Sequence, residues 1–110
     1  MGAPDLLEHD GQAIGYCSYA LTDSPGEMKL EQLYLLPELH GRGYGGHMLR
    51  HVEVRARSLG ADTLVLTVNK HNAGSIAVYR KAGFSVREEA VFDIGNGFVM
   101  DDYVMVKRLA

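Results

Sequence analysis

The residues best suited to chemistry lie in one glycine-rich turn. Four of residues 41–46 are glycine, and the turn follows an apolar stretch that ends at Pro37. An amphipathic pattern begins directly after it, so the turn is expected to leave backbone N–H groups free at the start of a helix. Such groups bind phosphate, because several amide hydrogen bonds and the helix dipole act on the same anion. The turn therefore predicts a binding site for a phosphorylated ligand.

The surrounding residues narrow the choice of phosphate motif. A P-loop needs Lys followed by Ser or Thr at the helix start, and residues 41–50 contain no such pair. Gly41, Gly43 and Gly46 do have the G-x-G-x-x-G spacing of a dinucleotide-binding domain. That motif is usually accompanied by an acidic residue at the end of the next strand, where this chain has Asn69. Since too few residues follow for a doubly wound sheet, a dinucleotide-binding domain is kept only as an alternative.

The elements that position this turn follow from hydrophobic periodicity and turn residues. They are expected in the order β-β-β-α-β-α-β-β, with a hairpin at each end. Asp10-Gly11 predicts a tight hairpin turn, because both of its positions need positive φ. Gly60 and Gly83 are expected to end the two helices, and Asn72 to cap the second. The predicted strands are 5–9, 12–21, 28–36, 63–69, 86–93 and 98–107, and the predicted helices run from about 43 to 59 and from about 73 to 82.

Composition limits the kind of protein. The 110 residues are expected to form one domain, 1–110, and their net charge of −3 argues against a nucleic acid as partner. No apolar run has the roughly 18 residues needed to cross a membrane, and residues 1–10 lack the pattern of a secretory signal. The single cysteine, Cys17, cannot form an internal disulfide, and we expect it to be a small buried strand residue. A cytoplasmic location follows as the default.

Two separated blocks resemble the GNAT superfamily of N-acyltransferases. The family's acyl-CoA signature has Gln or Arg, then x-x-Gly-x-Gly or x-x-Gly-x-Ala, and this chain offers Gly43 and Gly45 with His40 in place of Gln or Arg. Residues 72–84 match the family's N-x-x-A-x-x-x-Y-x-x-x-G-F block, and the ending DDYVMVKRL resembles its last strand. The resemblance covers nearly all of residues 12–109.

The resemblance implies a fold and a cofactor. The expected fold is α/β (α+β), a mixed, mostly antiparallel sheet of about six strands around a central β-α-β unit. The sheet should split between strands 28–36 and 63–69, where the pantetheine arm of acetyl-CoA would pair with the backbone of Leu33 and Leu35. Strand 63–69 is nearly all apolar, and we expect it to be buried on both faces. No metal is implied. The residues expected to bind the cofactor are Leu33, Leu35, His40, Gly41, Arg42, Gly43, Tyr44, Gly45, Gly46 and Asn72.

The implied reaction is transfer of an acetyl group to a primary amine of a small molecule or peptide by direct attack. A backbone N–H near Leu35 would stabilise the oxyanion, and Tyr79 would protonate the departing thiolate. An alkylamine of pKa ~10.4 is mostly protonated at pH 7, and its deprotonation costs about 4.6 kcal/mol, so a base is expected. Some family members carry a glutamate where this chain has Thr67. Glu31 is therefore the candidate base, and the other candidates are His40, His71 and Asp102.

The acceptor side of the site is open to several interpretations. Family domains usually begin with a strand and two helices, which build much of the acceptor wall, whereas this chain begins at the first hairpin. The chain is then a fragment, or it is completed by a partner subunit, or it is a minimal non-catalytic acyl-CoA-binding or regulatory module. The uncovered first strand favours a homodimer. If they line the mouth of the site, Asp93, Asp101 and Asp102 would attract a cationic acceptor.

Overall fold

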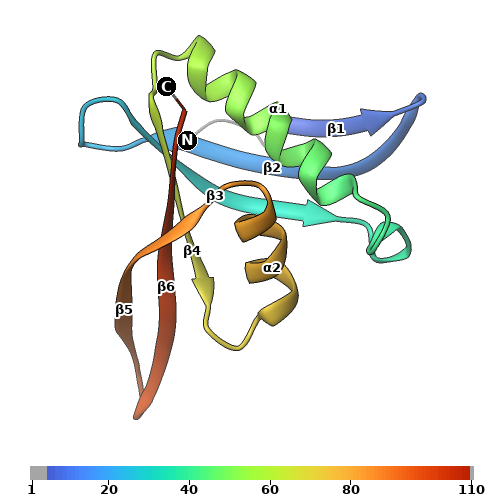
Figure 1. The fold of residues 1–110 in the computed structure, drawn as a ribbon. Coiled ribbons are helices and arrows are strands. Elements are labelled where there is room, and N and C mark those ends of the chain that lie inside the picture. Colours follow the sequence, from blue (N-terminus) through green and yellow to red (C-terminus); the bar gives the residue numbers. More distant parts are fainter. Residues whose placement is uncertain (1–4, 110) are drawn as a thin grey trace.

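A computed structural model describes residues 5–109, apart from the side chains of residues 92 and 100. Six strands form one sheet in the order β1-β2-β3-β4-β6-β5, in which β3 and β4 are parallel and all other pairs are antiparallel (Figure 1). This arrangement confirms the expected fold class and element order. Residues 1–10 are expected not to form a secretory signal, and residues 1–4 of that segment lie outside the described range. The elements are β1 Asp5–His9, β2 Gln12–Leu21, β3 Glu27–Leu35, η1 Pro37–Leu39, α1 Tyr44–Ser58, β4 Thr63–Asn69, α2 Ala73–Lys81, β5 Ser85–Gly95 and β6 Phe98–Arg108.

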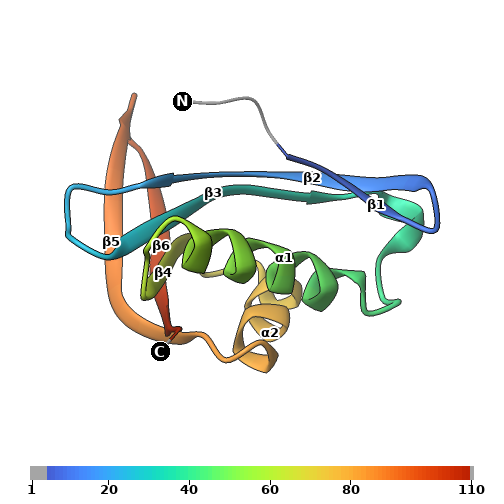
Figure 2. The ribbon, with the colours of Figure 1, turned by 90° about the horizontal axis from the view of Figure 1, so that it is seen from above.

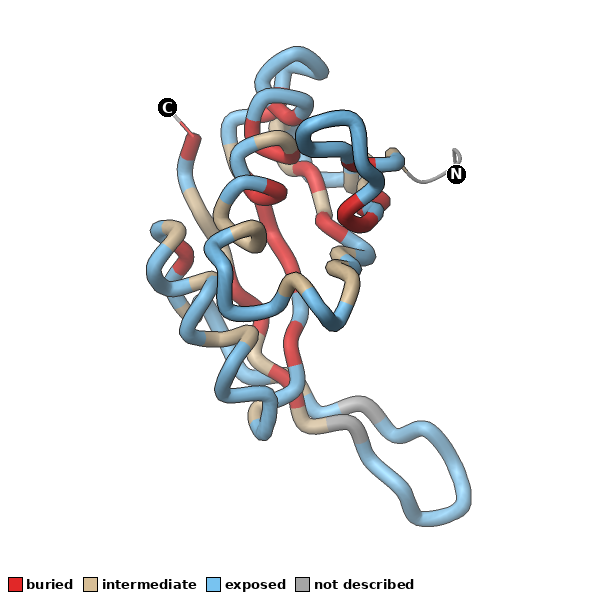
Figure 3. Tube along the Cα trace, turned by 90° about the vertical axis from the view of Figure 1, so that its right-hand side faces the viewer, coloured by how far each residue is buried: buried red, intermediate tan, exposed pale blue. Residues whose placement is uncertain are grey.

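The two hairpin turns form as their residues predict. Asp10 and Gly11 have φ of 52° and 79°, and Asn96 and Gly97 have φ of 53° and 79°. Positive φ at both central positions gives the turn a twist that matches the flanking strands. The end of the β5–β6 hairpin projects from the body and is exposed (Figure 3).

Several element boundaries differ from the sequence-based prediction by one or two residues. Strand β3 ends at Leu35 rather than at residue 36, because Pro37 starts the short 3-10 helix η1, which was not predicted. Helix α1 starts at Tyr44, with Gly43 as its N-cap. Strand β5 is longer than expected, since its pairing with β6 runs from Ser85 opposite Val106 to Gly95 opposite Phe98. Strand β6 extends by one residue to Arg108, which pairs with Thr63 on β4.

Both helices lie on the same side of the sheet (Figure 2). The core forms between that face and α1, and its largest fully buried side chains are Met28, Met48, Leu49, Leu64, Leu66 and Met105. The expectation that β4 is buried on both faces is wrong for its second half: Thr67 and Asn69 are exposed, because the described helices cover one face only. Neither α1 nor α2 is long and apolar enough to span a membrane.

The sheet opens between β3 and β4. These strands pair only from Glu27 opposite Thr63 to Lys29 opposite Val65. Beyond that point β3 continues along β2 while β4 continues along β6, so their inner edges diverge (Figure 1). The expected split is confirmed, and it leaves part of the β3 backbone without a strand partner on that side.

Candidate functional site

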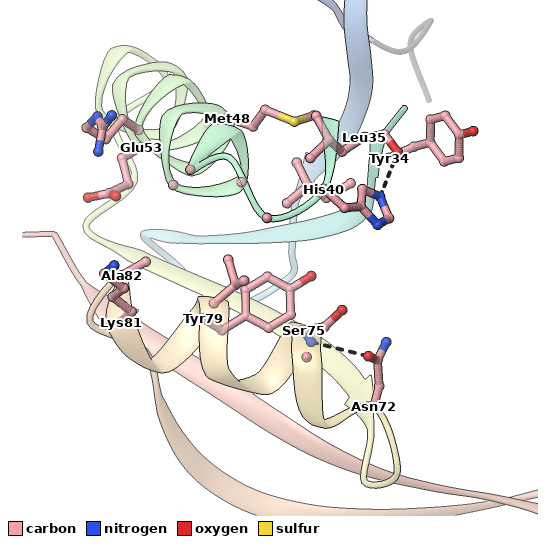
Figure 4. A pocket seen from close by; sticks show the side chains of 18 of the residues that line it. Tyr34, Leu35, His40, Met48, Glu53, Asn72, Ser75, Tyr79, Lys81 and Ala82 are labelled. Carbon is pink, nitrogen blue, oxygen red and sulfur yellow. Dashed lines mark hydrogen bonds between the residues drawn. The ribbon is translucent and has the colours of Figure 1, made fainter. Parts of the chain in front are cut away.

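A groove of about 1230 Å³ lies at this split. It is larger than a usual small-molecule site of roughly 300–1,000 Å³. Its walls come from the end of β3, the glycine-rich turn, the first half of α1, and α2 (Figure 4). The residues expected to bind the cofactor that do line the groove are Leu33, Leu35, His40, Gly41, Gly43, Gly45, Gly46 and Asn72. Two others do not: Arg42 is exposed outside the lining, and Tyr44 packs its ring against His9, with ring centroids 5.4 Å apart.

The glycine-rich turn presents the start of α1 to the groove. Gly43 is the N-cap of α1 and has φ +82°, a left-handed conformation that side chains with a Cβ rarely adopt. The cap has no side-chain hydrogen bond, so no described side chain caps the first N–H groups of α1. An anion in the groove would complete these hydrogen bonds, as the sequence pattern predicts.

Helix α2 approaches α1 closely at Gly45. A Cβ at this position would lie 3.1 Å from Cγ1 of Val78, tighter than ordinary van der Waals contact. The two sequence blocks, far apart along the chain, therefore form opposite walls of one groove.

The free edge of β3 also faces the groove. The N–H of Leu36 donates to the carbonyl of Ile14 on β2 at 2.9 Å. Because hydrogen-bonding direction alternates along a strand, the N–H and C=O of Leu33 and Leu35 point to the open side. The Leu35 carbonyl oxygen lies 3.0 Å from Nε2 of His40, which donates to it. His40 therefore links the turn to β3 by a hydrogen bond, while the Leu35 N–H stays available to a ligand.

Tyr79 lies on the opposite wall, on α2. Its side chain is partly buried against Phe84, with ring centroids 5.8 Å apart, and its hydroxyl points into the groove (Figure 4). Burial raises the pKa of the Tyr79 hydroxyl above its ordinary value. The group is therefore protonated at neutral pH and has a proton to donate.

Comparison with known proteins assigns this chain to a family. The model described as "Acetyltransferase (GNAT) family" matches residues 3–84. The chain belongs to the GNAT family. An uncharacterized N-acetyltransferase of Mycobacterium tuberculosis (strain ATCC 25618 / H37Rv) is 35% identical over 101 residues, which cover 92% of this chain and 64% of the relative. The IAA acetyltransferase of Azospirillum brasilense is 30% identical over 91 residues, covering 79% of this chain and 60% of the relative. The chain thus spans less than two thirds of the length of these curated relatives.

Solved structures share the GNAT fold with this chain. An IAA acetyltransferase from Bacillus cereus ATCC 14579 superposes with a TM-score of 0.80 at 23% identity, over 94% of this chain and 75% of that one. An acetyltransferase from Salmonella typhimurium, solved with its cofactor acetyl-CoA, superposes with a TM-score of 0.78 at 24% identity, over 96% of this chain and 63% of that one.

Asn72, from the second GNAT block, caps α2 as predicted. Its Oδ1 accepts a hydrogen bond from the N–H of Ser75 at 3.2 Å. The side chain lines the groove at the same time, so a contact with the cofactor stays a prediction.

The residues predicted as the base of this GNAT chain lie less favourably than those predicted to bind the cofactor. Glu31 is exposed and does not line the groove. It has no opposite residue on β2, because the strand register shifts between Leu30, opposite Tyr19, and Gln32, opposite Ser18. His71 is also exposed and lies outside the lining. The structure does not bring Glu31 to Tyr79, and its role as base stays a prediction.

Three aspartates were expected to attract the acceptor, and their environments differ. Asp93 is exposed and its Oδ1 accepts from the N–H of Gly95 at 2.9 Å, while Asp101 lies 2.8 Å from Nζ of Lys70. Asp102 is only 3% exposed, and its Oδ1 has no hydrogen-bond partner among the described residues. Asp102 is thus the carboxylate of this GNAT chain that most needs a partner.

Sequence reasoning missed the buried ion pair of Glu53 and Lys107, whose two members both line the groove. Glu53 is buried on α1, and its Oε1 lies 2.9 Å from Nζ of Lys107 on β6. Glu53 occupies a position on the buried face of α1, next to Val52 and three residues before Ala56. A charged residue there was the available signal, because a buried carboxylate needs a cationic partner.

Proposed function

We propose that this GNAT chain carries out N-acetylation, transferring the acetyl group of acetyl-CoA to a primary amine of a small molecule or peptide. One observation carries the proposal: the free edge of β3, the N-terminus of α1 and the hydroxyl of Tyr79 all face one groove. Family membership supports the reaction class, and the Salmonella typhimurium structure with acetyl-CoA supports the cofactor.

The cofactor would be held mainly by backbone groups. The pantetheine amides would pair with Leu33 and Leu35, and the pyrophosphate would lie over the amides of residues 41–46. A helix dipole contributes only about 0.3–1 kcal/mol at an exposed site. The amide hydrogen bonds of the turn must therefore supply most of the phosphate binding. No metal is needed for these contacts.

The proposed chemistry is a direct attack. The amine nitrogen bonds to the thioester carbonyl carbon, and a backbone N–H near Leu35 stabilises the oxyanion that forms. The C–S bond then breaks, the thiolate receives the proton of Tyr79, and the amine proton passes to a base. Glu31, directly or through water, is the proposed base.

We propose that Asp102 binds the cationic acceptor. Side chains alternate along β6, and Lys107 points to α1, so Asp102 faces the opposite side of the sheet. It pairs in register with Asn69, at the end of β4 where the sheet is split. An ammonium group would complete the hydrogen bonding of a buried carboxylate. Some relatives are named for small acceptors, such as the L-methionine sulfoximine/L-methionine sulfone acetyltransferase of Pseudomonas aeruginosa. These names support a small-molecule acceptor.

The position of Glu31 favours one alternative, an acyl-CoA-binding or regulatory module without transferase activity. Thr67 cannot act as a base, and Glu53, which does line the groove, is paired with Lys107. A dinucleotide-binding domain has less support, because the described sheet has only one parallel strand pair.

Calorimetry with acetyl-CoA, and separately with NAD, tests the proposal. We expect acetyl-CoA to bind and Gly45→Asp to abolish binding, because it places a carboxylate and extra volume at the phosphate turn. Val54→Asp is the matched control, since it adds the same charge on the exposed side of α1. Binding of NAD but not acetyl-CoA would overturn the assignment. Acetyl-CoA binding without acetylation of any amine in a broad panel would favour the binding module.

We also propose a homodimer and a cytoplasmic location. Strand β1 pairs with β2 on one side only among the described residues, and such an edge can pair with a second copy. Light scattering during size-exclusion chromatography should report twice the 12.1 kDa of one chain. A monomer at working concentration would contradict the dimer.

A further inference from the structure

A second cluster of reactive side chains lies away from the groove. Asp5 on β1, Cys17 on β2 and His51 on α1 bring one ligand atom each within 4.8 Å of one another. None of the three lines the acetyl-CoA groove. His51 is on the side of α1 that meets β1, so the cluster joins the first hairpin to this helix.

The three side chains offer sulfur, nitrogen and oxygen donors. Cys17 is completely buried, whereas the side chains of His51 and Asp5 are 36% and 34% exposed, so solvent reaches the cluster from one side. Nε2 of His51 lies 3.1 Å from Oδ2 of Asp5. In a tetrahedral zinc site the donors lie about 2.0–2.3 Å from the metal and hence roughly 3.3–3.7 Å from one another. Since the three donor atoms already lie within 4.8 Å of one another, binding requires each pair to move closer by at most about 1.5 Å.

Two further residues hold the Asp5 carboxylate in place. The hydroxyl of Tyr19 donates to Oδ2 of Asp5, and Nε of Arg55 donates to the Tyr19 hydroxyl at 2.9 Å. These hydrogen bonds lower the pKa of Asp5, with Tyr19 as the main cause and His51 next. Metal-binding carboxylates commonly have such outer partners, which orient the ligand. The second oxygen of Asp5 is left to bind a metal.

We propose that Asp5, Cys17 and His51 form a Zn²⁺ site with water as the fourth ligand. The mixed donor set selects Zn²⁺ over Mg²⁺ or Ca²⁺, which prefer oxygen ligands alone. On binding, a Zn–S bond replaces the S–H bond of Cys17, and the proton goes to solvent. His51 takes the neutral tautomer protonated at Nδ1, so the lone pair of Nε2 binds the metal in place of its hydrogen bond to Asp5. The metal would link β1, β2 and α1, and so stabilise the hairpin against the helix that carries the phosphate turn.

Competition for Zn²⁺ against a chromophoric chelator tests the site. We expect one Zn²⁺ per chain, with affinity reduced about 100-fold or more by Cys17→Ser and by His51→Gln, since loss of an outer partner alone costs about 10–100-fold. His47→Gln is the matched control: His47 is an exposed histidine on the same helix, with its ring centroid 5.6 Å from that of His9, and its loss should leave binding unchanged.

Cobalt spectroscopy decides whether the thiolate is a ligand. Co²⁺ in the same site should give a thiolate-to-cobalt charge-transfer band, present in His47→Gln and absent in Cys17→Ser. Absence of stoichiometric zinc, unchanged affinity in His51→Gln, loss of binding in His47→Gln, or a cobalt spectrum without the thiolate band would each overturn the proposal. His51→Gln and the cobalt spectrum keep the test valid if Cys17→Ser does not fold.

Discussion

Nζ of Lys107 lies 2.9 Å from Oε1 of Glu53 and 2.6 Å from the carbonyl oxygen of Ala82. One ammonium group thus joins β6, α1 and the C-terminal end of α2. The side chains of Lys107 and Glu53 are 23% and 10% exposed, so the pair is largely shielded from water. Because α1 and α2 are the two helical walls of the groove, this contact fixes the distance between them.

Lys107→Met should destabilise the fold strongly. It leaves the Glu53 carboxylate buried without its partner, and breaking a buried pair on one side costs about 3–5 kcal/mol of unfolding free energy. Urea denaturation measures the loss, and Lys81→Met, at an exposed lysine on α2, is the control. The double variant Lys107→Met/Glu53→Leu should recover most of the stability. If Lys107→Met were as stable as the control Lys81→Met, a structural role for the ion pair of Lys107 and Glu53 would be contradicted.

Tyr79→Phe should separate catalysis from binding. Removal of a general acid lowers the rate of transfer by about 10²–10⁴-fold, whereas acetyl-CoA affinity should be unchanged because the ring still packs against Phe84. Steady-state kinetics and calorimetry on the same samples measure the two quantities. Tyr16→Phe, at an exposed tyrosine on β2 outside the groove lining, should change neither. A loss of affinity with no loss of rate would assign Tyr79 to packing alone.

The pH profile should rise toward alkaline pH. Below the amine pKa of about 10.4, the free-amine fraction increases about tenfold per unit, so kcat/KM for an alkylamine acceptor should increase with pH. Tyr79 is active when its hydroxyl is protonated. Burial raises the pKa of Tyr79, so the protonated form persists to higher pH. No fall is therefore expected until above about pH 10. A fall between pH 7 and 9 would indicate that another group supplies the proton.

Asp102→Asn should affect the acceptor and not the cofactor. A hydrogen bond to a charged group contributes about 1.5–3 kcal/mol, so KM for a cationic acceptor should rise about 10–100-fold. Acetyl-CoA affinity should be unchanged, since Asp102 does not line the groove. Asp23→Asn, at an exposed loop carboxylate, is the control. An unchanged acceptor KM would remove Asp102 from the acceptor site.

Much of the fold was predictable from sequence because it depends on neighbouring residues. The Asp10-Gly11 turn, the Asn72 cap and the Gly43 start of α1 are each decided within a few positions along the chain. The same holds for the glycine-rich turn of residues 41–46, in which Gly41 and Gly43 have positive φ. Element order and the location of the groove at the start of α1 follow from these local signals.

The tertiary structure alone decided which distant residues meet. Residues from different elements form the ion pair of Glu53 and Lys107 and the cluster of Asp5, Cys17 and His51. The packing of several elements likewise leaves Oδ1 of Asp102 buried without a hydrogen-bond partner among the described residues. The exposure of Thr67 and the position of Glu31 outside the groove lining depend on which face the helices cover and on where β3 leaves β4. Local propensity contains no information on these relations, because they arise only when the sheet and helices pack against one another.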